Sequence, residues 1–214
     1  VVSPSGFIII DKPSGITSHG CVNELRKLYK TKRIGHGGTL DPKVTGVLPI
    51  AIGNATRLLR YLPSDKQYRG VIQLGISTKT DDLGGEVISK GDWPLLDHVN
   101  LEKYLDSFRG EIQQRPPMIS SIHINGQRAY ALARRGAVFQ LEKRSRTVHE
   151  LLLLKWDQSL GEIEISIHCS AGTYIRSIAR DIGEKIGCGA CLSKLRRTKA
   201  LGFEESRSIS LSSL

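Results

Sequence analysis

Residues 35–42 read Gly-His-Gly-Gly-Thr-Leu-Asp-Pro, and this loop is the most unusual local feature of the chain. Three glycines within four positions allow positive φ angles and a close approach of the backbone to a ligand. The common phosphate-binding patterns do not apply, because no Gly-Lys-Ser/Thr follows and a dinucleotide fingerprint would need a third glycine at another offset. The loop therefore holds one carboxylate, Asp41, which is either an active group or a turn aspartate that bonds its own backbone.

The composition around this loop indicates a globular, basic protein. The chain has 214 residues, of which 39% are hydrophobic, enough for one domain or for one large domain with a small lobe. Lys and Arg number 31 and Asp and Glu 21, so the net charge is +10 and favours a nucleic acid over an anionic membrane as partner. No apolar run approaches the roughly 20 residues of a membrane-spanning helix, and no signal peptide opens the sequence. Four cysteines without a secretory signal predict reduced thiols and a cytoplasmic protein.

The pattern of apolar residues mixes strands and helices. Short apolar or alternating runs predict strands at residues 6–10, 46–52, 68–77, 86–89, 147–156 and 162–169. Capping residues and apolar spacing predict helices at residues 17–29, 54–62, 100–108, 128–135 and 173–186, with Asn100 as the cap of the third. Because strands and helices do not alternate regularly, we expect an α+β domain with a large mixed β-sheet flanked by helices and loops.

Two regions concentrate positive charge. Residues 113–146 are expected to form a protruding basic lobe. Arg115-Pro116-Pro117 cannot lie inside a helix, and the segment contains seven cations. They are Arg115, Arg128, Arg134, Arg135, Lys143, Arg144 and Arg146. A second run, residues 194–199, is either a solvated face or a track for phosphates.

Three further side chains could have a special role, two of them in contact with a nucleic acid. Tyr68 lies between cations at the start of a strand, which suits base stacking but also an ordinary strand tyrosine. His36 is either structural or able to stack on or displace a base. Arg176 stands in the first turn of a helix, where the helix dipole disfavours a cation, so an ion pair with a buried carboxylate would account for it.

A zinc site is the weakest of the functional hypotheses. Cys188 and Cys191 form one C-x-x-C pair, and His168 and Cys169 precede it. Neither a second C-x-x-C nor a paired histidine accompanies it, so we expect no metal.

Seven segments form an ordered set of motifs along the chain. They are Asp11-Lys12-Pro13-x-Gly15-x-Thr17-Ser18, Gly35-His36-x-Gly38-x-Leu40-Asp41-Pro42-x-x-Thr45-Gly46-Val47-Leu48-Pro49, Lys66-x-Tyr68, Arg115-Pro116-Pro117, Gly126-x-Arg128-x-Tyr130, Gly172-Thr173-Tyr174-Ile175-Arg176 and Leu195-Arg196-Arg197. In this order they resemble the TruB family of tRNA pseudouridine synthases. The resemblance extends from residue 6 to about residue 203, and the long motif around Asp41 is highly specific.

The resemblance implies a pseudouridine synthase fold over residues 1–214 and isomerisation of the T-loop uridine at position 55 of tRNA. It implies no metal and no organic cofactor. Asp41 would be the nucleophile, attacking either the ribose C1′ or the base. Tyr68 would stack on the flipped uracil and help remove its C5 proton, and Arg176 would pair with Asp41.

The remaining site residues implied by the resemblance surround this centre. Tyr174 and Leu195 would line the pocket, and His36 would occupy the space that the extruded base leaves. Lys12 and Pro13 would support the active-site loops. The lobe at residues 113–146 is similar to the family's RNA-gripping insertion.

The expected partner is the T-arm of tRNA, bound by a monomer in the cytoplasm, or in an organelle if the source is eukaryotic. Members of the family often continue into a small C-terminal RNA-binding domain of the PUA type, which we expect to be absent or truncated here. The alternative function is a catalytically idle tRNA-binding or chaperone module of the same fold.

Overall fold

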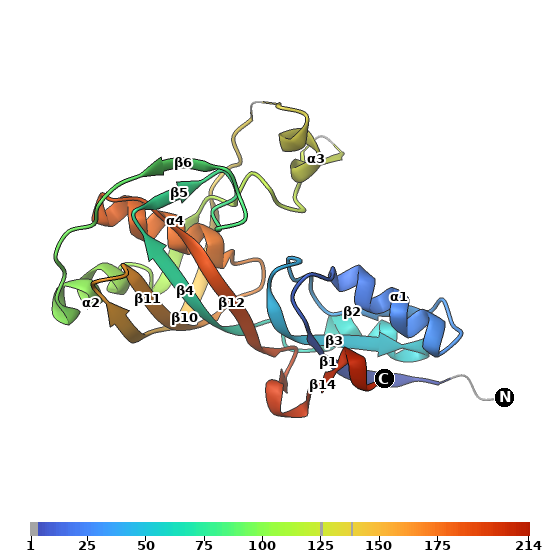
Figure 1. Cartoon of the computed structure of the whole chain (residues 1–214). Coiled ribbons are helices and arrows are strands. Elements are labelled where there is room, and N and C mark those ends of the chain that lie inside the picture. Colours follow the sequence, from blue (N-terminus) through green and yellow to red (C-terminus); the bar gives the residue numbers. More distant parts are fainter. Residues whose placement is uncertain (1–3, 125, 138) are drawn as a thin grey trace. The chain divides into compact units, whose positions relative to one another are not determined.

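The chain divides into two compact parts. The computed structural model describes residues 4–124, 126–137 and 139–214 (Figure 1). One part, here the terminal unit, consists of Val1–Arg69 and Leu195–Leu214, and the other, the central unit, consists of Gly70–Lys194. Strands β4 (Lys66–Leu74) and β12 (Ala190–Ala200) each contribute residues to both units.

Parallel and antiparallel strands are mixed in the terminal unit, where the strand order is β14-β1-β3-β12. β3 is antiparallel to β1 and to β2, and parallel to β12, while β14 is parallel to β1. The strands besides β4 and β12 are β1 (Gly6–Lys12), β2 (Ile34–His36), β3 (Thr45–Ile52), β13 (Phe203–Glu204) and β14 (Ile209–Ser210).

Helix α1 (Ser18–Leu28) covers one face of these strands. The Thr17 hydroxyl accepts a hydrogen bond from the Gly20 N–H, so the predicted start of this helix is confirmed. The core below it is built from α1, β1, β2 and β3 and comprises Ile10, Cys21, Val22, Leu25, Ile34, Leu48, Ile50 and Ile52. The remaining helical segments of the unit are 3₁₀ turns, η1 (Gly53–Tyr61), η2 (Glu205–Arg207) and η3 (Leu211–Ser213).

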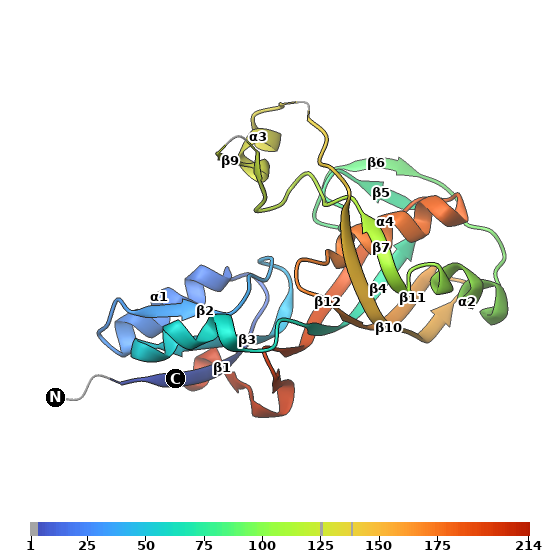
Figure 2. The ribbon, with the colours of Figure 1, turned by 180° about the vertical axis from the view of Figure 1, so that it is seen from behind.

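In the central unit the strand order is β4-β11-β10-β7 (Figure 2). The strands are β7 (Gly110–Gln114), β10 (Arg144–Asp157) and β11 (Glu162–Cys169), with two small hairpins, β5 (Ile76–Thr78) with β6 (Val87–Lys90) and β8 (His123–Ile124) with β9 (Gln127–Arg128). β11 alternates strictly between buried and half-buried residues, as expected for a strand with one face in the core. The strands predicted at residues 147–156 and 162–169 are thereby confirmed.

The described residues of the central unit form three α-helices: α2 (His98–Asp106), α3 (Ala129–Arg134) and α4 (Ile175–Ile186). α4 buries its apolar side and ends at Gly187, as predicted. The prediction that Asn100 caps α2 is wrong. The Asp97 carboxylate is the cap, because it accepts a hydrogen bond from the Asn100 N–H at 2.7 Å and the helix begins at His98.

The predicted fold class, α+β with a mixed sheet, is confirmed. The interpretation of residues 194–199 as either a solvated face or a phosphate track is wrong for Arg197. This segment belongs to strand β12, and Arg197 is fully buried.

We expect Gly46→Ala to destabilise the terminal unit far more than Gly15→Ala. Both glycines have a positive φ, but a Cβ at Gly46 would lie 2.2 Å from the Arg197 carbonyl oxygen on the parallel neighbour β12, whereas one at Gly15 meets open space. Gly15→Ala, which adds backbone strain alone, should lower the free energy of unfolding by about 1 kcal/mol. Gly46→Ala, which adds strain and a backbone clash, should lower it by about 3 kcal/mol or more. Urea unfolding of both variants measures the difference, and equal losses would contradict the close approach of β3 and β12.

Candidate active site around Asp41

The backbone on both sides of Asp41 is firmly held. The Ser18 hydroxyl accepts a hydrogen bond from the Leu40 N–H at 2.8 Å and donates one to the Leu40 carbonyl at 3.2 Å. On the other side, the Pro42 carbonyl accepts from the Gly15 N–H at 2.9 Å. Asp41 itself is exposed. The loop therefore presents a carboxylate to solvent from a backbone with little freedom to move.

Lys12 ties this loop to the segment that follows β1. Its side chain is fully buried, and its ammonium group donates to the carbonyls of Pro13, Ile16 and Pro42 at 2.9, 2.8 and 3.0 Å. Burial lowers the pKa of Lys12, and the negative charge of Asp41 is among the effects that oppose this shift. The role predicted for Lys12, support of the loops, agrees with these contacts, and Pro13 takes part through its carbonyl while its side chain is exposed.

Arg197 is a buried residue of this site that the sequence-based analysis missed. Its Nε donates to the Val47 carbonyl at 2.8 Å and one terminal nitrogen donates to the Gly38 carbonyl at 3.1 Å. Burial lowers the pKa of the guanidinium. Tyr68 opposes that shift through its charge and through a hydrogen bond to Arg197. No pattern in the sequence marks Arg197 for burial, and its neighbour Arg196 on β12 is half-exposed.

Two other predicted site residues lie on strands of the terminal unit. Tyr68 is 7% exposed and interacts with Arg197, so it is not an ordinary rim tyrosine. Leu195 is half-buried on β12. The structure thus brings Asp41, Lys12, Tyr68 and Arg197 into one electrostatic neighbourhood of the terminal unit.

His36 ends β2, opposite Ile50 of β3. It is half-buried, and its Nδ1 is buried without a hydrogen bond to any described residue. Burial lowers the pKa of His36, and the positive charges of Arg197 and His19 add to this effect. The imidazole is therefore kept neutral at the entrance of the glycine loop.

Arg176 and Tyr174 lie in the central unit, at the start of α4. The Arg176 guanidinium forms an ion pair with Asp82 at 3.8 Å. Arg176 is buried but Asp82 is only half-buried, so the expected ion pair is present with a less buried carboxylate than predicted. The Tyr174 N–H and carbonyl are both bound by the Gln114 amide, at 2.8 and 3.0 Å. Because Arg176 and Asp41 belong to different units, their pairing stays a prediction.

Two other cations of β12, Arg196 and Lys199, are engaged by acids. Arg196 makes a bidentate pair with Asp11 at 2.9 and 3.0 Å and also contacts Glu205, while Lys199 contacts Glu204 at 2.8 Å. These pairs compete with phosphate for the same cations, which weakens the interpretation of this strand as a phosphate track.

Both thiols of the C-x-x-C pair are free. Burial, with the nearby Asp82 and Asp81 charges, raises the pKa of Cys191 to about 11. A metal at this position would have to displace the proton of a buried thiol beside two carboxylates.

Solved structures share this fold. A chain in the structure of an H/ACA ribonucleoprotein bound to a substrate RNA containing 2′-deoxyuridine is 32% identical, with a TM-score of 0.71 over 97% of this chain and 51% of that one. A chain of a Cbf5–Nop10–Gar1 complex is 33% identical, with a TM-score of 0.73 over 97% of this chain and 52% of that one. The chain thus spans about half the length of these proteins.

Family models and curated relatives define the class of protein, which is that of the pseudouridylate synthases. The model for the TruB family pseudouridylate synthase N-terminal domain matches residues 26–175, and the model for the tRNA pseudouridylate synthase B C-terminal domain matches residues 176–214. Within this class the chain belongs to the TruB family, whose members are isomerases that act on uridine in tRNA.

Three of the relatives are bacterial proteins named tRNA pseudouridine synthase B. That of Synechococcus sp. (strain CC9311) is 59% identical over 98% of this chain and 70% of its own length. That of Parasynechococcus marenigrum (strain WH8102) is 60% identical over 97% of this chain and 72% of its own length. That of Prochlorococcus marinus (strain MIT 9313) is 59% identical over 97% of this chain but only 65% of its own length.

Among the described residues, no helix is long and apolar enough to cross a membrane.

The neutral state of His36 predicts a specific pH dependence of stability. Its pKa in the folded chain lies below the ordinary 6.5, so at lower pH the unfolded chain binds more protons and the free energy of unfolding falls as pH drops. We expect His36→Gln to lose less stability than the wild type between about pH 7 and about pH 5. Urea unfolding at several pH values measures this, with His123→Gln, an exposed histidine, as the control. Parallel curves for His36→Gln and the wild type would contradict a buried neutral imidazole.

Proposed function

We propose that this protein isomerises the uridine at position 55 in the T loop of tRNA, with Asp41 as the nucleophile. The observation that carries this proposal is the exposed carboxylate of Asp41 on a backbone fixed by Ser18, Gly15 and Lys12. A nucleophile must be ionised, accessible and correctly placed. The hydrogen bonds to Leu40 and Pro42, on either side of Asp41, support its correct placement.

The proposed reaction breaks the bond between C1′ of the ribose and N1 of uracil and forms one between C1′ and C5. Asp41 attacks either C1′ or the base, the uracil turns within the site, and the bond to Asp41 breaks once C1′ is joined to C5. C5 then loses its proton and N1 gains one, so the product is an isomer of the substrate. The proposed reaction exchanges no electrons with another molecule and needs no redox cofactor.

The uracil has to leave its stack before Asp41 can reach it. Flipping costs a few kcal/mol, which stacking on an aromatic ring can offset. Tyr68 is the proposed stacking platform, and its interaction with Arg197 supports a fixed ring position. His36, neutral and next to the glycine loop, is proposed to occupy the space left by the base, while Leu195 and Tyr174 line the pocket and Arg176 pairs with Asp41 during the reaction.

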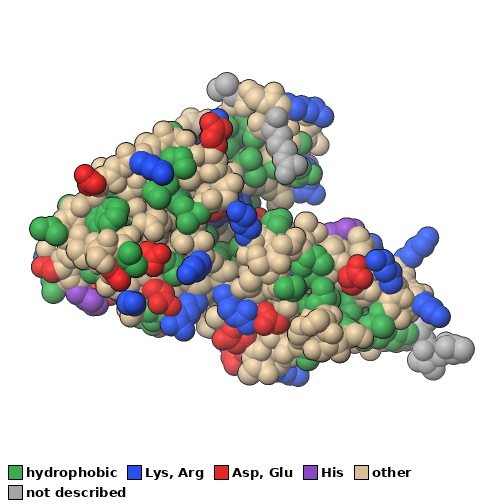
Figure 3. Space-filling model, viewed as in Figure 1, with side chains coloured by type: hydrophobic (Ala, Val, Ile, Leu, Met, Phe, Trp, Pro, Cys, Tyr) green, Lys and Arg blue, Asp and Glu red, His purple; other side chains and the backbone are tan. Residues whose placement is uncertain are grey.

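The insertion, defined here as residues 115–143, is proposed to grip the T-arm. Arg128, Arg135 and Lys143 are exposed on it, and Figure 3 shows Lys and Arg side chains at its surface. With a net charge of +10, phosphate contacts would supply much of the affinity. We propose that the protein acts as a monomer in the cytoplasm, and the free state of all four cysteines supports a reducing compartment.

We expect Asp41→Asn to abolish pseudouridine formation while tRNA binding persists. Loss of a covalent nucleophile should lower the rate by about four orders of magnitude or more. Chemical mapping of pseudouridine in an unmodified tRNA transcript, after incubation with each variant, measures the effect. Glu24→Gln, which removes an exposed carboxylate from α1 of the same unit, is the control and should retain activity. Turnover of Asp41→Asn near that of the wild type would refute the nucleophile, and a wild type that binds tRNA without modifying it would favour an idle binding module.

We expect Tyr68→Phe to lose turnover much more than binding. The ring still stacks on uracil, but the hydroxyl that takes part in proton transfer and contacts Arg197 is gone. Removal of a general acid or base should lower the single-turnover rate by about 100-fold or more. Rate and dissociation constant for tRNA are measured on the same preparation, and a loss confined to binding would show that the hydroxyl moves no proton.

A further inference from the structure

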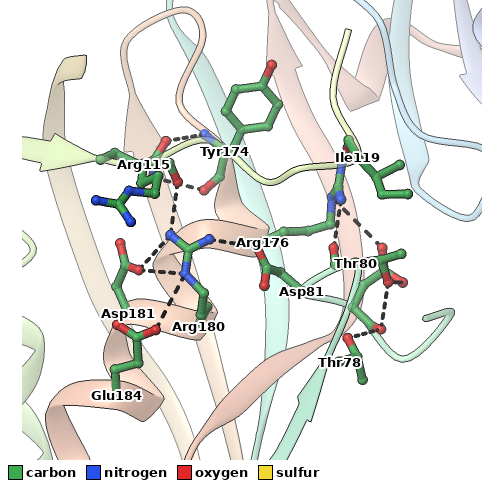
Figure 4. A network of polar contacts seen from close by, with 12 residues as sticks. Thr78, Thr80, Asp81, Arg115, Ile119, Tyr174, Arg176, Arg180, Asp181 and Glu184 are labelled. Atoms are coloured by element: carbon green, nitrogen blue, oxygen red, sulfur yellow. Dashed lines mark hydrogen bonds and ion pairs between the residues drawn. The ribbon is translucent and has the colours of Figure 1, made fainter. Parts of the chain in front are cut away.

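Two arginines of α4, Arg176 and Arg180, reach the same two segments of the central unit from successive turns. One segment is the turn at residues 80–82 after β5, and the other is the start of the insertion at residues 115–119. Figure 4 shows both side chains with the groups that they bind. Residues four apart in a helix share one face, so both arginines can act on one surface.

Arg180 has the larger set of partners. It donates to the Asp81 carboxylate at 2.8 Å and to the Arg115 carbonyl at 2.9 Å. On its own helix it contacts Asp181 at 2.7 Å and Glu184 at 3.9 Å. Burial works against its charge, but Asp81 and Asp181 outweigh burial and raise the pKa of the guanidinium.

Arg176 makes the corresponding contacts one turn earlier. It donates to the Thr80 carbonyl at 2.7 Å and to the Ile119 carbonyl at 3.0 Å. Since carbonyl groups of the insertion accept from both arginines, the first residues of the insertion are bound to α4 at two points four residues apart.

Other polar contacts hold the segments that flank the insertion. Gln114, the last residue of β7, binds the Tyr174 backbone through both atoms of its amide. Arg146, beyond the end of the insertion, donates to the Gly172 carbonyl at 3.0 Å. The insertion is thus fixed where it leaves and rejoins the central unit.

Loss of the Arg180 guanidinium would destabilise this region because Arg180 forms an ion pair with a buried carboxylate. Asp81 is 9% exposed, has a positive φ of 60° and is held by Arg180. Without the guanidinium, a buried carboxylate and the Arg115 carbonyl would both lose a charged donor, which favours opening of this region.

We propose that Arg180 is a positioning residue that fixes the start of the insertion and the Asp81 turn on α4, so that the insertion's basic side chains meet RNA in one arrangement. The RNA part of this inference rests on the proposed function. A segment ordered before binding pays less conformational entropy when it binds, so the loss of Arg180 should appear in tRNA affinity more than in the chemical step.

Hydrogen exchange of the full chain tests the structural part. In Arg180→Gln, the backbone amides of residues 115–137 should exchange at least about tenfold faster than in the wild type. The reason is that hydrogen bonds from a charged group oppose local opening of this segment. Amides of β10 and β11 should be unaffected. Arg180→Lys, which keeps the charge but cannot bind Asp81 and Arg115 together, should show an intermediate effect and is the substitute if Arg180→Gln does not fold.

The matched control is Arg109→Gln. Arg109 is also ion-paired in the central unit, with Glu102 and Asp106, and donates to the Leu151 carbonyl away from the insertion. This variant should leave exchange in residues 115–137 as in the wild type. Unchanged exchange in both Arg180 variants, or an equal increase in Arg109→Gln, overturns the proposal.

Binding and single-turnover kinetics with tRNA test the RNA part. Arg180→Gln should raise the dissociation constant about tenfold and change the rate at saturating tRNA by no more than about threefold, as expected when pre-organisation alone is lost. An unchanged dissociation constant with a large loss of rate would overturn the proposal, because Arg180 would then act on the chemistry. If the wild type modifies no tRNA, the proposed function fails, while exchange and tRNA binding still decide the role of Arg180.

Discussion

The structure of the candidate site depends on one buried charge. Lys12 is enclosed completely, and its ammonium group is satisfied by the carbonyls of Pro13, Ile16 and Pro42. A buried ammonium is tolerated only when such acceptors surround it, so each carbonyl has to stay where it is. Lys12 therefore fixes the end of β1, the segment before α1 and the residue that follows Asp41. This buried contact fixes the backbone next to Asp41, while the Asp41 side chain itself is exposed.

A second buried cation organises the other side of the glycine loop. Arg197 binds the carbonyls of Val47 and Gly38 and contacts Tyr68, so one guanidinium connects the loop, β3 and the proposed stacking residue. Close approach of β3 to β12 makes this possible, since any side chain at Gly46 would collide with the Arg197 backbone. Gly38, Gly46 and Arg197 thus depend on one another. Because these glycines have no side chain, the Arg197 guanidinium can reach the backbone oxygens.

In the central unit, Arg176 and Arg180 bind carbonyl groups of the insertion from one face of α4. The two family models meet between residues 175 and 176, inside this helix, whereas the compact units change at residues 69–70 and 194–195. Boundaries taken from sequence families and boundaries set by packing therefore differ here. The family boundary cuts α4 after its first residue, so Arg176 and Arg180 fall in the C-terminal model while the carbonyls that they bind fall in the N-terminal one.

The sequence by itself determined the α+β class and the positions of helices such as α1 and α4, and it singled out the loop that carries Asp41 as unusual. These depend on local pattern: apolar periodicity, a capping hydroxyl and clustered glycines act within a few residues of one another. Only the tertiary structure decided that Arg197 is buried rather than solvated, that Lys12 is bound to three carbonyls, and that Arg180 holds the insertion to α4. A charged residue looks the same in a sequence whether it meets water or buried oxygens, because its partners are brought to it by distant segments of the fold.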